Sequence, residues 1–172
     1  MSVADDLSGE VRGETVNPCI EGVMSVFQDR MRNILDDHGI EQPDPQPDEW
    51  YPMSKFVRVL DVVGTDVGEN AQEKIGEATP QFINWPTQPD SPADALERLI
   101  DAFDNTHRNV DGDYSFYQTD DGEGRITSTT PYPEMWEKGM LKGAAEEHGA
   151  AYASVEIVDD TDHGKKLFEI SW

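Results

Sequence analysis

Basic side chains are scarce in this sequence, and their scarcity excludes several classes of partner. Lys and Arg number 13 against 36 Asp and Glu, which gives the 172 residues a net charge of -23. A chain without a basic patch cannot replace the counterions of duplex DNA or of an anionic membrane, so we expect neither nucleic acid nor membrane as a partner. The acids are spread along the whole chain, as suits concentrated salt, which screens their repulsion. The composition therefore predicts a halophilic, archaeon-like source.

Cysteine and long apolar runs are also missing. Cys19 is the only cysteine, which excludes an internal disulfide and a thiolate zinc cluster. Its apolar neighbours favour a small core side chain, and a redox-sensitive thiol is the second reading. No apolar run approaches the length of about 20 residues that spans a bilayer, and no charged-then-apolar leader opens the sequence. We therefore expect a cytoplasmic protein.

Sequence motifs for catalysis are absent as well. The sequence contains no GxSxG, Walker loop, GxGxxG or HExxH pattern. The histidines are scattered near the ends of expected elements rather than clustered as metal ligands are: His38, His107, His148 and His163. We expect no catalytic residue and no bound metal, and an enzyme ranks third among the readings of the function.

The first half of the chain has the periodicity of helices. Apolar residues at spacings of three and four predict amphipathic helices over residues 18–38 and 53–63. A shorter helix is expected over residues 66–78, and Ser91 before Pro92 predicts the start of another, with the serine as N-cap. Residues 1–16 are polar and aperiodic, which predicts a flexible N-terminal segment ahead of a single domain at residues 17–172.

After residue 111 the pattern changes to the alternation typical of strands. "DYSFYQT" and "GRITSTT" across "DDGE" predict one hairpin, and "AYASVEIV" and "KKLFEISW" across "DDTDHG" predict a second. A helix over residues 133–149 lies between them. The predicted fold class is therefore α+β, a helical N-terminal half followed by β-β-α-β-β with a four-stranded antiparallel sheet.

The helix between the hairpins carries Gly139 and Gly143, each of which costs about 1 kcal/mol relative to alanine in a helix interior. Two explanations are open. The glycines form a small face with Ala144 that lets the helix backbone approach its neighbour closely, or they leave room for a ligand. We prefer close packing.

The order of these elements resembles the heme-nitric oxide/oxygen binding (H-NOX) domains and their wider superfamily. That superfamily includes vinyl-reductase-type ligand-binding domains and certain Golgi-transport tethering subunits. The resemblance spans residues 17–172 and is carried by the layout and by the segments "ALERLIDAF", "YPEMWEKGMLKGAA" and "LFEISW". It implies a sensory ligand-binding domain of signal transduction, with a pocket between the helical half and the sheet.

The residues that bind heme in the gas-sensing branch are not matched. The resemblance implies a proximal histidine on the helix that corresponds to "ALERLIDAF", where this chain has Leu96, Glu97 and Arg98. It also implies a Tyr-x-Ser-x-Arg motif that holds the heme propionates, and "ITSTTPYPEMW" offers Ser128 without the tyrosine and the arginine. His107 lies further along the chain and would have to move into the pocket to replace the histidine. We therefore expect no cofactor and, in particular, no heme bound as in the family.

The predicted function is that of a non-catalytic sensory or regulatory domain that binds a small apolar ligand or a protein partner. The alternative is an interaction or adaptor module, such as a homodimer, with a filled core and no ligand. Seven residues expected around the pocket are candidate ligand contacts: Phe27, Trp85, Leu99, Phe103, Trp136, Met140 and Gly143.

Overall fold

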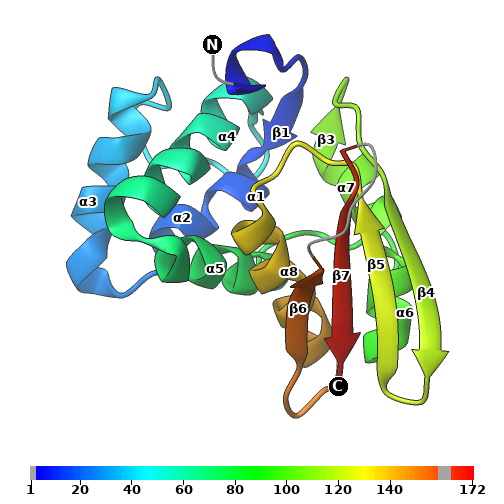
Figure 1. The fold of residues 1–172 in the computed structure, drawn as a ribbon. Coiled ribbons are helices and arrows are strands. Elements are labelled where there is room, and N and C mark those ends of the chain that lie inside the picture. The colour runs from blue at the N-terminus through cyan, green and yellow to red at the C-terminus, as the bar shows by residue number, and fades with distance from the viewer. Residues whose placement is uncertain (1–2, 159–163) are drawn as a thin grey trace.

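The structure, a computed structural model, describes residues 3–158 and 164–172 and joins a helical half to a sheet (Figure 1). The helical elements are η1 (Val3–Asp6), α1 (Gly13–Val16), α2 (Pro18–Glu21), α3 (Ser25–Asp37), α4 (Met53–Val62), the π-helical turn η2 (Val63–Val67), α5 (Glu69–Ala78), η3 (Thr79–Gln81), α6 (Pro92–Glu97), α7 (Leu99–Thr106) and α8 (Glu134–Glu147). The strands are β1 (Glu10–Arg12), β2 (Trp50–Pro52), β3 (His107–Arg108), β4 (Tyr114–Asp120), β5 (Glu123–Ser128), β6 (Ser154–Val158) and β7 (Lys166–Ser171).

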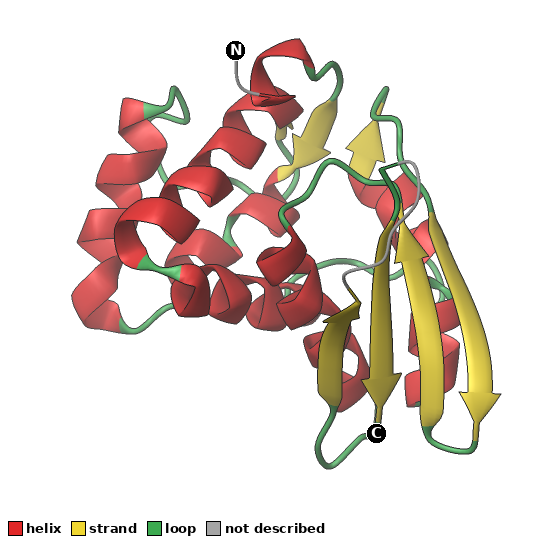
Figure 2. Cartoon of the chain, viewed as in Figure 1, coloured by secondary structure: helices red, strands yellow, loops and turns green. Residues whose placement is uncertain are grey.

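The larger sheet has the strand order β4-β5-β7-β6, and every neighbouring pair is antiparallel. Helices α6, α7 and α8 lie behind this sheet in the view of Figures 1 and 2, while no helix of the described residues lies on its other face. The predicted α+β class, with its β-β-α-β-β order and four-stranded antiparallel sheet, is confirmed. Residues 159–163 of the predicted second connection lie outside the described residues.

A second, three-stranded sheet with the order β2-β1-β3 was not predicted, and it changes the picture of the N-terminus. Residues 10–16, which we expected to be flexible, form β1 and α1. Val11 has no exposed surface, and the N–H group of Gly13 donates to the carbonyl of Glu49 over 2.8 Å. Because its strand partners come from distant residues, this segment is ordered without any local periodicity.

One predicted helix start is confirmed, whereas one predicted helix is broken in two. The hydroxyl of Ser91 accepts a hydrogen bond from the N–H group of Asp94 over 3.1 Å, so the predicted N-cap is present. The helix predicted over residues 18–38 is instead two helices, because Gly22 ends α2 and Met24 has an extended backbone. The break leaves the Met24 side chain 70% exposed.

Helices α5 and α8 cross at a contact made by glycine. A Cβ atom on Gly139 would lie 1.9 Å from the carbonyl oxygen of Glu73, and one on Gly143 would lie 2.1 Å from that of Glu77. Across the same contact, a Cβ on Gly76 would lie 2.0 Å from the carbonyl oxygen of Trp136. The two backbones therefore touch, and the glycines serve close packing rather than ligand space.

The hydrophobic core lies between α4, α8 and the covered face of the larger sheet. Its fully buried side chains include Phe56 on α4, Leu141 on α8 and Phe168 on β7. Cys19 is also completely buried, and this burial raises the pKa of its thiol to about 12, which supports a core role for it. Within the described ranges, no helix has both the length and the apolar character needed to cross a membrane.

Candidate functional site

A small cavity lies where α7 and α8 face each other. It has a volume of about 30 Å³ and is lined by Thr15, Thr79, Ile83, Leu99, Ala102, Phe103, Thr106, His107, Tyr114, Tyr132, Trp136 and Met140. Four of the seven candidate ligand contacts come together here, namely Leu99 and Phe103 from α7 and Trp136 and Met140 from α8. Spacing of four residues places each pair on one face of its helix.

The other three candidates lie elsewhere. Phe27 is 45% exposed on α3, beyond the break at Gly22. Trp85 is buried, donates from its indole N–H to the carbonyl of Pro80, and meets the ring of His148 edge-on at 5.0 Å. Gly143 contacts α5 through its backbone. Only the first four are therefore positioned to contact a ligand in this cavity.

His107 lines the cavity, although the sequence analysis did not place it there. It follows α7 directly, is buried, and stacks on the ring of Phe103 with the centroids 4.0 Å apart. Its Nδ1 lies 3.0 Å from the carbonyl oxygen of Phe103, which can only accept, so Nδ1 carries the proton. Nε2 then presents a lone pair, which accepts from the hydroxyl of Tyr132 over 2.5 Å. The expectation that His107 must move to reach the pocket is therefore wrong, since it already lines the cavity.

Burial sets the protonation state of His107. Loss of solvent lowers the pKa of the imidazole to about 4, and the hydrogen bond to the Phe103 carbonyl opposes that shift only in part. The ring is therefore neutral at pH 7. A neutral imidazole with its Nδ1 proton fixed by a backbone carbonyl is the form that binds metals through Nε2.

This burial predicts a measurable pH dependence. Between about pH 6.5 and pH 4 the unfolded chain protonates His107 and the folded chain does not, so unfolding is favoured as the pH falls. Over that window His107 contributes a slope of up to about 1.4 kcal/mol per pH unit to the free energy of unfolding. His107→Phe removes the titrating group, and denaturant titrations from pH 7 to pH 4 should show a shallower pH dependence for this variant. Equal slopes would contradict the buried neutral state.

Aromatic rings fill most of the space beside His107. The rings of Tyr132 and Trp136 stack with centroids 4.0 Å apart, and Phe56 meets Tyr132 edge-on at 5.9 Å. Two buried polar atoms at the cavity, Oγ1 of Thr15 and Nε1 of Trp136, have no hydrogen-bond partner in the described part of the chain. Unpartnered buried donors mark positions where a water or a polar ligand atom would bind.

A buried carboxylate beside the cavity was also missed by the sequence reasoning. Glu137, in the first turn of α8, has no exposed surface and forms an ion pair with Lys166 of β7, its Oε2 lying 2.5 Å from Nζ. Tyr114, which lines the cavity, donates from its hydroxyl to Oε1 over 2.8 Å. No local spacing signals this contact, because the register of the sheet brings the partners together.

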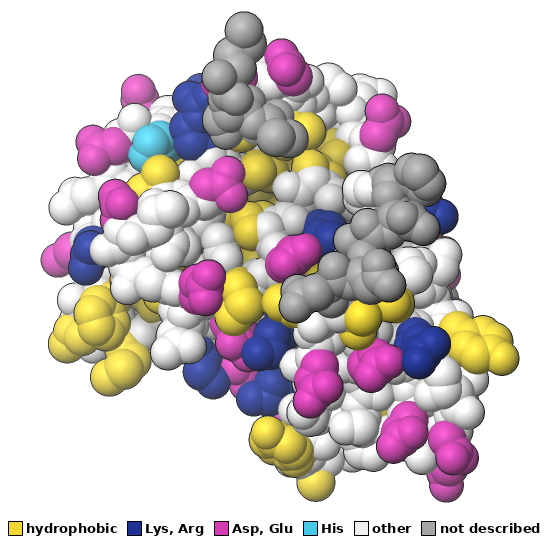
Figure 3. Space-filling model, viewed as in Figure 1, with side chains coloured by type: hydrophobic (Ala, Val, Ile, Leu, Met, Phe, Trp, Pro, Cys, Tyr) yellow, Lys and Arg dark blue, Asp and Glu magenta, His cyan; other side chains and the backbone are white. Residues whose placement is uncertain are grey.

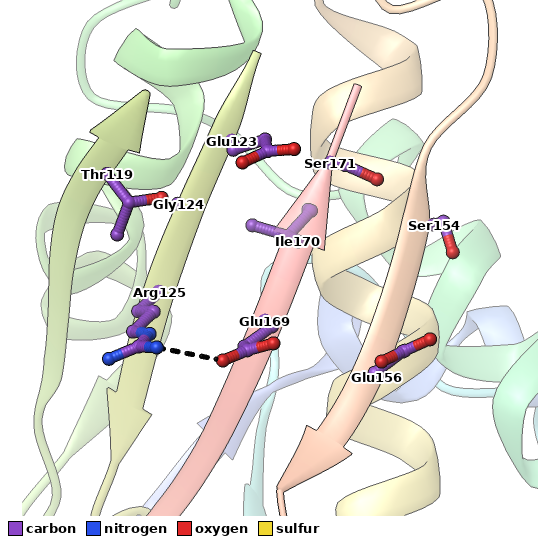
Figure 4. A pocket seen from close by; sticks show the side chains of 9 residues that line it. All are labelled: Thr119, Glu123, Gly124, Arg125, Ser154, Glu156, Glu169, Ile170 and Ser171. Atoms are coloured by element: carbon purple, nitrogen blue, oxygen red, sulfur yellow. Dashed lines mark ion pairs between the residues drawn. The ribbon is translucent and has the colours of Figure 1, made fainter. Parts of the chain in front are cut away.

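The uncovered face of the larger sheet carries a wider and shallower hollow (Figure 4). Its volume is about 440 Å³, and its lining is mostly polar: Thr119, Glu123, Gly124, Arg125, Ser154, Glu156, Glu169, Ile170 and Ser171. Arg125 and Glu169 form an ion pair of 3.1 Å across it. In the described ranges, no group of three or more His, Cys, Asp or Glu is arranged to hold a metal ion. The hollow lies open on the surface.

Comparison with solved structures identifies the architecture around the cavity. An H-NOX protein from S. oneidensis in the Fe(II)NO state superposes with a TM-score of 0.67 at 13% identity, covering 93% of this chain and 98% of that one. The fold is that of H-NOX domains. An oxygen-binding H-NOX domain related to soluble guanylate cyclases, in its oxygen complex, gives 0.62 at 11% identity and 92% coverage of both chains. No protein-family model and no curated protein matches the chain by sequence.

The comparison corrects the expectation about cofactors. We expected no cofactor and no heme, whereas the structures with the same H-NOX fold include proteins with Fe(II). Another concerns heme redox potential and porphyrin distortion, with a TM-score of 0.60, 12% identity and coverage of 94% of this chain and 99% of that one. These neighbours point to heme. The expectation of a cofactor-free domain is therefore contradicted.

The side chains at the cavity include a suitable ligand for heme iron, but the cavity is too small for a porphyrin. His107 offers a neutral Nε2 of the kind that binds iron. The cavity of about 30 Å³, however, has room for about one water molecule. A porphyrin can occupy this region only if Tyr132 and Trp136 leave their stacked positions.

Proposed function

We propose that this chain is a sensory domain that receives its ligand between α7 and α8, with heme as the cofactor held through His107. The observation that carries the proposal is the buried, neutral imidazole whose Nε2 faces the cavity lining and whose Nδ1 is fixed by the Phe103 carbonyl. The H-NOX fold supports it. The domain would sense a small molecule that binds between α7 and α8.

Each residue has a defined part in the proposed site. Nε2 of His107 would ligate the iron, and the Phe103 carbonyl would keep that nitrogen unprotonated. In the structure the hydroxyl of Tyr132 donates to the lone pair of Nε2, so this hydrogen bond must break before Nε2 can bind a metal. Bound heme would supply an iron atom with an open position for a diatomic gas. The ring of Trp136 must also leave its stack with Tyr132, and its unpartnered N–H would then be available as a hydrogen-bond donor.

Hemin titration of the purified chain tests the proposal. We expect a saturable, one-to-one complex with a sharp Soret band that is lost in His107→Ala. Tyr132→Phe removes the competing hydroxyl while it keeps the ring, so this matched variant should bind hemin more tightly than the unaltered chain. A Soret band that is the same in His107→Ala and the unaltered chain would refute ligation by His107.

A second candidate function, an interaction module with a filled core, is favoured by an exposed apolar group on the helical half. Three apolar side chains at the start of α3 are exposed: Met24 by 70%, Val26 by 74% and Phe27 by 45%. Figure 3 shows hydrophobic side chains gathered over this N-terminal end of the helix. Native mass spectrometry in high salt separates the two functions. A stoichiometric small molecule favours the sensor, and an empty chain of defined oligomeric state favours the module.

In either case we propose that the domain works in the salt-rich cytoplasm of a halophile.

A further inference from the structure

The carboxylate of Glu137 is surrounded by hydroxyl groups from the sheet and its adjoining loop. Its Oε1 accepts from Oη of Tyr114 over 2.8 Å, from Oγ of Ser128 over 2.7 Å, and from Oγ1 of Thr130. Tyr114 and Ser128 are direct cross-strand partners of β4 and β5, so the sheet register holds both hydroxyls on the same side. Three donors on one carboxylate oxygen indicate a site shaped for an anion.

Lys166 completes this site from β7. Its Nζ lies 2.5 Å from Oε2 of Glu137 and donates to the carbonyl oxygens of Tyr132 over 2.5 Å and Thr130 over 3.0 Å. Two of the three ammonium protons are thus donated to backbone carbonyls, and the contact with Oε2 is an ion pair rather than a hydrogen bond. The lysine is thus held in place by two backbone carbonyls and faces one carboxylate.

The groups that donate to Glu137 and the carboxylate itself come from different parts of the fold. All the donors, Tyr114, Ser128, Thr130 and Lys166, come from β4, β5, β7 and the segment that follows β5, and we call them the carboxylate cradle. The single carboxylate, that of Glu137, comes from α8. Packing alone gives no reason for this arrangement, because an apolar residue in place of a buried ion pair is often as stable or more stable.

We propose that the carboxylate cradle is a binding site for the carboxylate of a small organic acid, and that Glu137 is a tethered occupant which such a ligand displaces. Tyr114 belongs both to the cradle and to the cavity lining, so the apolar part of the acid would lie toward the cavity. That placement rests on the proposed function of the cavity. Displacement of Glu137 would free the first turn of α8 from the sheet and so convert ligand binding into a movement of this helix.

Chemical rescue tests the cradle. Glu137→Ala removes the tethered carboxylate and leaves the donors unoccupied, so the melting temperature should fall. Added acetate should restore it saturably, by about 5–10 °C when acetate is ~100-fold above its dissociation constant. Sodium chloride of the same ionic strength should not. Glu137→Gln is the matched control, because its amide fills the same space and leaves acetate no room.

Two further measurements keep the test decisive. Lys166→Met in the Glu137→Ala background should abolish the acetate effect, and a folded Glu137→Ala that responds equally to acetate and chloride overturns the proposal. If Glu137→Ala does not fold in any buffer, calorimetry of the unaltered chain with acetate decides. Saturable binding that is lost in Lys166→Met supports the cradle, and its absence overturns it. Neither experiment involves iron or His107, so the heme proposal and the cradle can fail independently.

Discussion

Gly143→Ala is expected to destabilise the fold by about 1–3 kcal/mol, although alanine is the better helix former by about 1 kcal/mol. The added methyl group would lie 2.1 Å from the carbonyl oxygen of Glu77, where no side-chain rotation can relieve the contact, because the obstacle is backbone. Gly139→Ala meets the carbonyl of Glu73 at 1.9 Å and should behave alike. Either substitution forces α5 and α8 apart. Denaturant titration in molar salt measures the loss.

Two further variants make the experiment specific to the helix crossing. Glu147→Ala changes an exposed residue near the end of α8, so it should alter the unfolding free energy by no more than about 0.5 kcal/mol. Gly143→Leu should be less stable than Gly143→Ala. A leucine variant that is more stable than the alanine variant would mean that space for a ligand exists at this position after all, against the backbone contact described above.

The residues with local signals were predicted well. Ser91 before Pro92 gave the start of α6 because N-capping depends on neighbours three residues apart. The two hairpin patterns gave all four strands of the larger sheet because alternation is visible within each strand. The strand at residues 10–12 was missed, since only its distant partners β2 and β3 make it a strand.

The residues that line the cavity were likewise predicted where helix spacing indicates them and missed where contacts between distant residues place them. Leu99 and Phe103 were found because a helix face can be read from spacing, and the same holds for Trp136 and Met140. Phe27 was included because the periodicity of α3 was extended across the break at Gly22. The contact of His107 with Tyr132 joins residues 25 positions apart, and no pattern within one element specifies it.

Dilution of salt is expected to loosen or unfold the domain. The 13 basic side chains can neutralise at most 13 of the 36 acids, and Figure 3 shows acidic side chains scattered over the visible face rather than gathered in one patch. Lowering the salt from 1 M to 0.01 M lengthens the screening distance from about 3 Å to about 30 Å, a span comparable with the domain itself. Repulsion between acids on opposite sides then adds to the free energy of the folded state. Circular dichroism and thermal melts through a potassium chloride titration measure the effect, and a melting temperature that is constant over this range would contradict it.

One pair of acids on the uncovered sheet face separates screening from other effects of salt. Glu156 of β6 and Glu169 of β7 are direct cross-strand partners, and like charges in that position repel each other (Figure 4). Arg125 pairs with Glu169 from the opposite side, so Glu156 is the carboxylate to remove. Glu156→Gln should raise the melting temperature at 0.01 M salt and change it little at 1 M, because molar salt already screens the repulsion to within about 3 Å. If the gain is the same at both salt concentrations, it comes from the amide side chain itself, and charge repulsion is not what salt relieves in this protein.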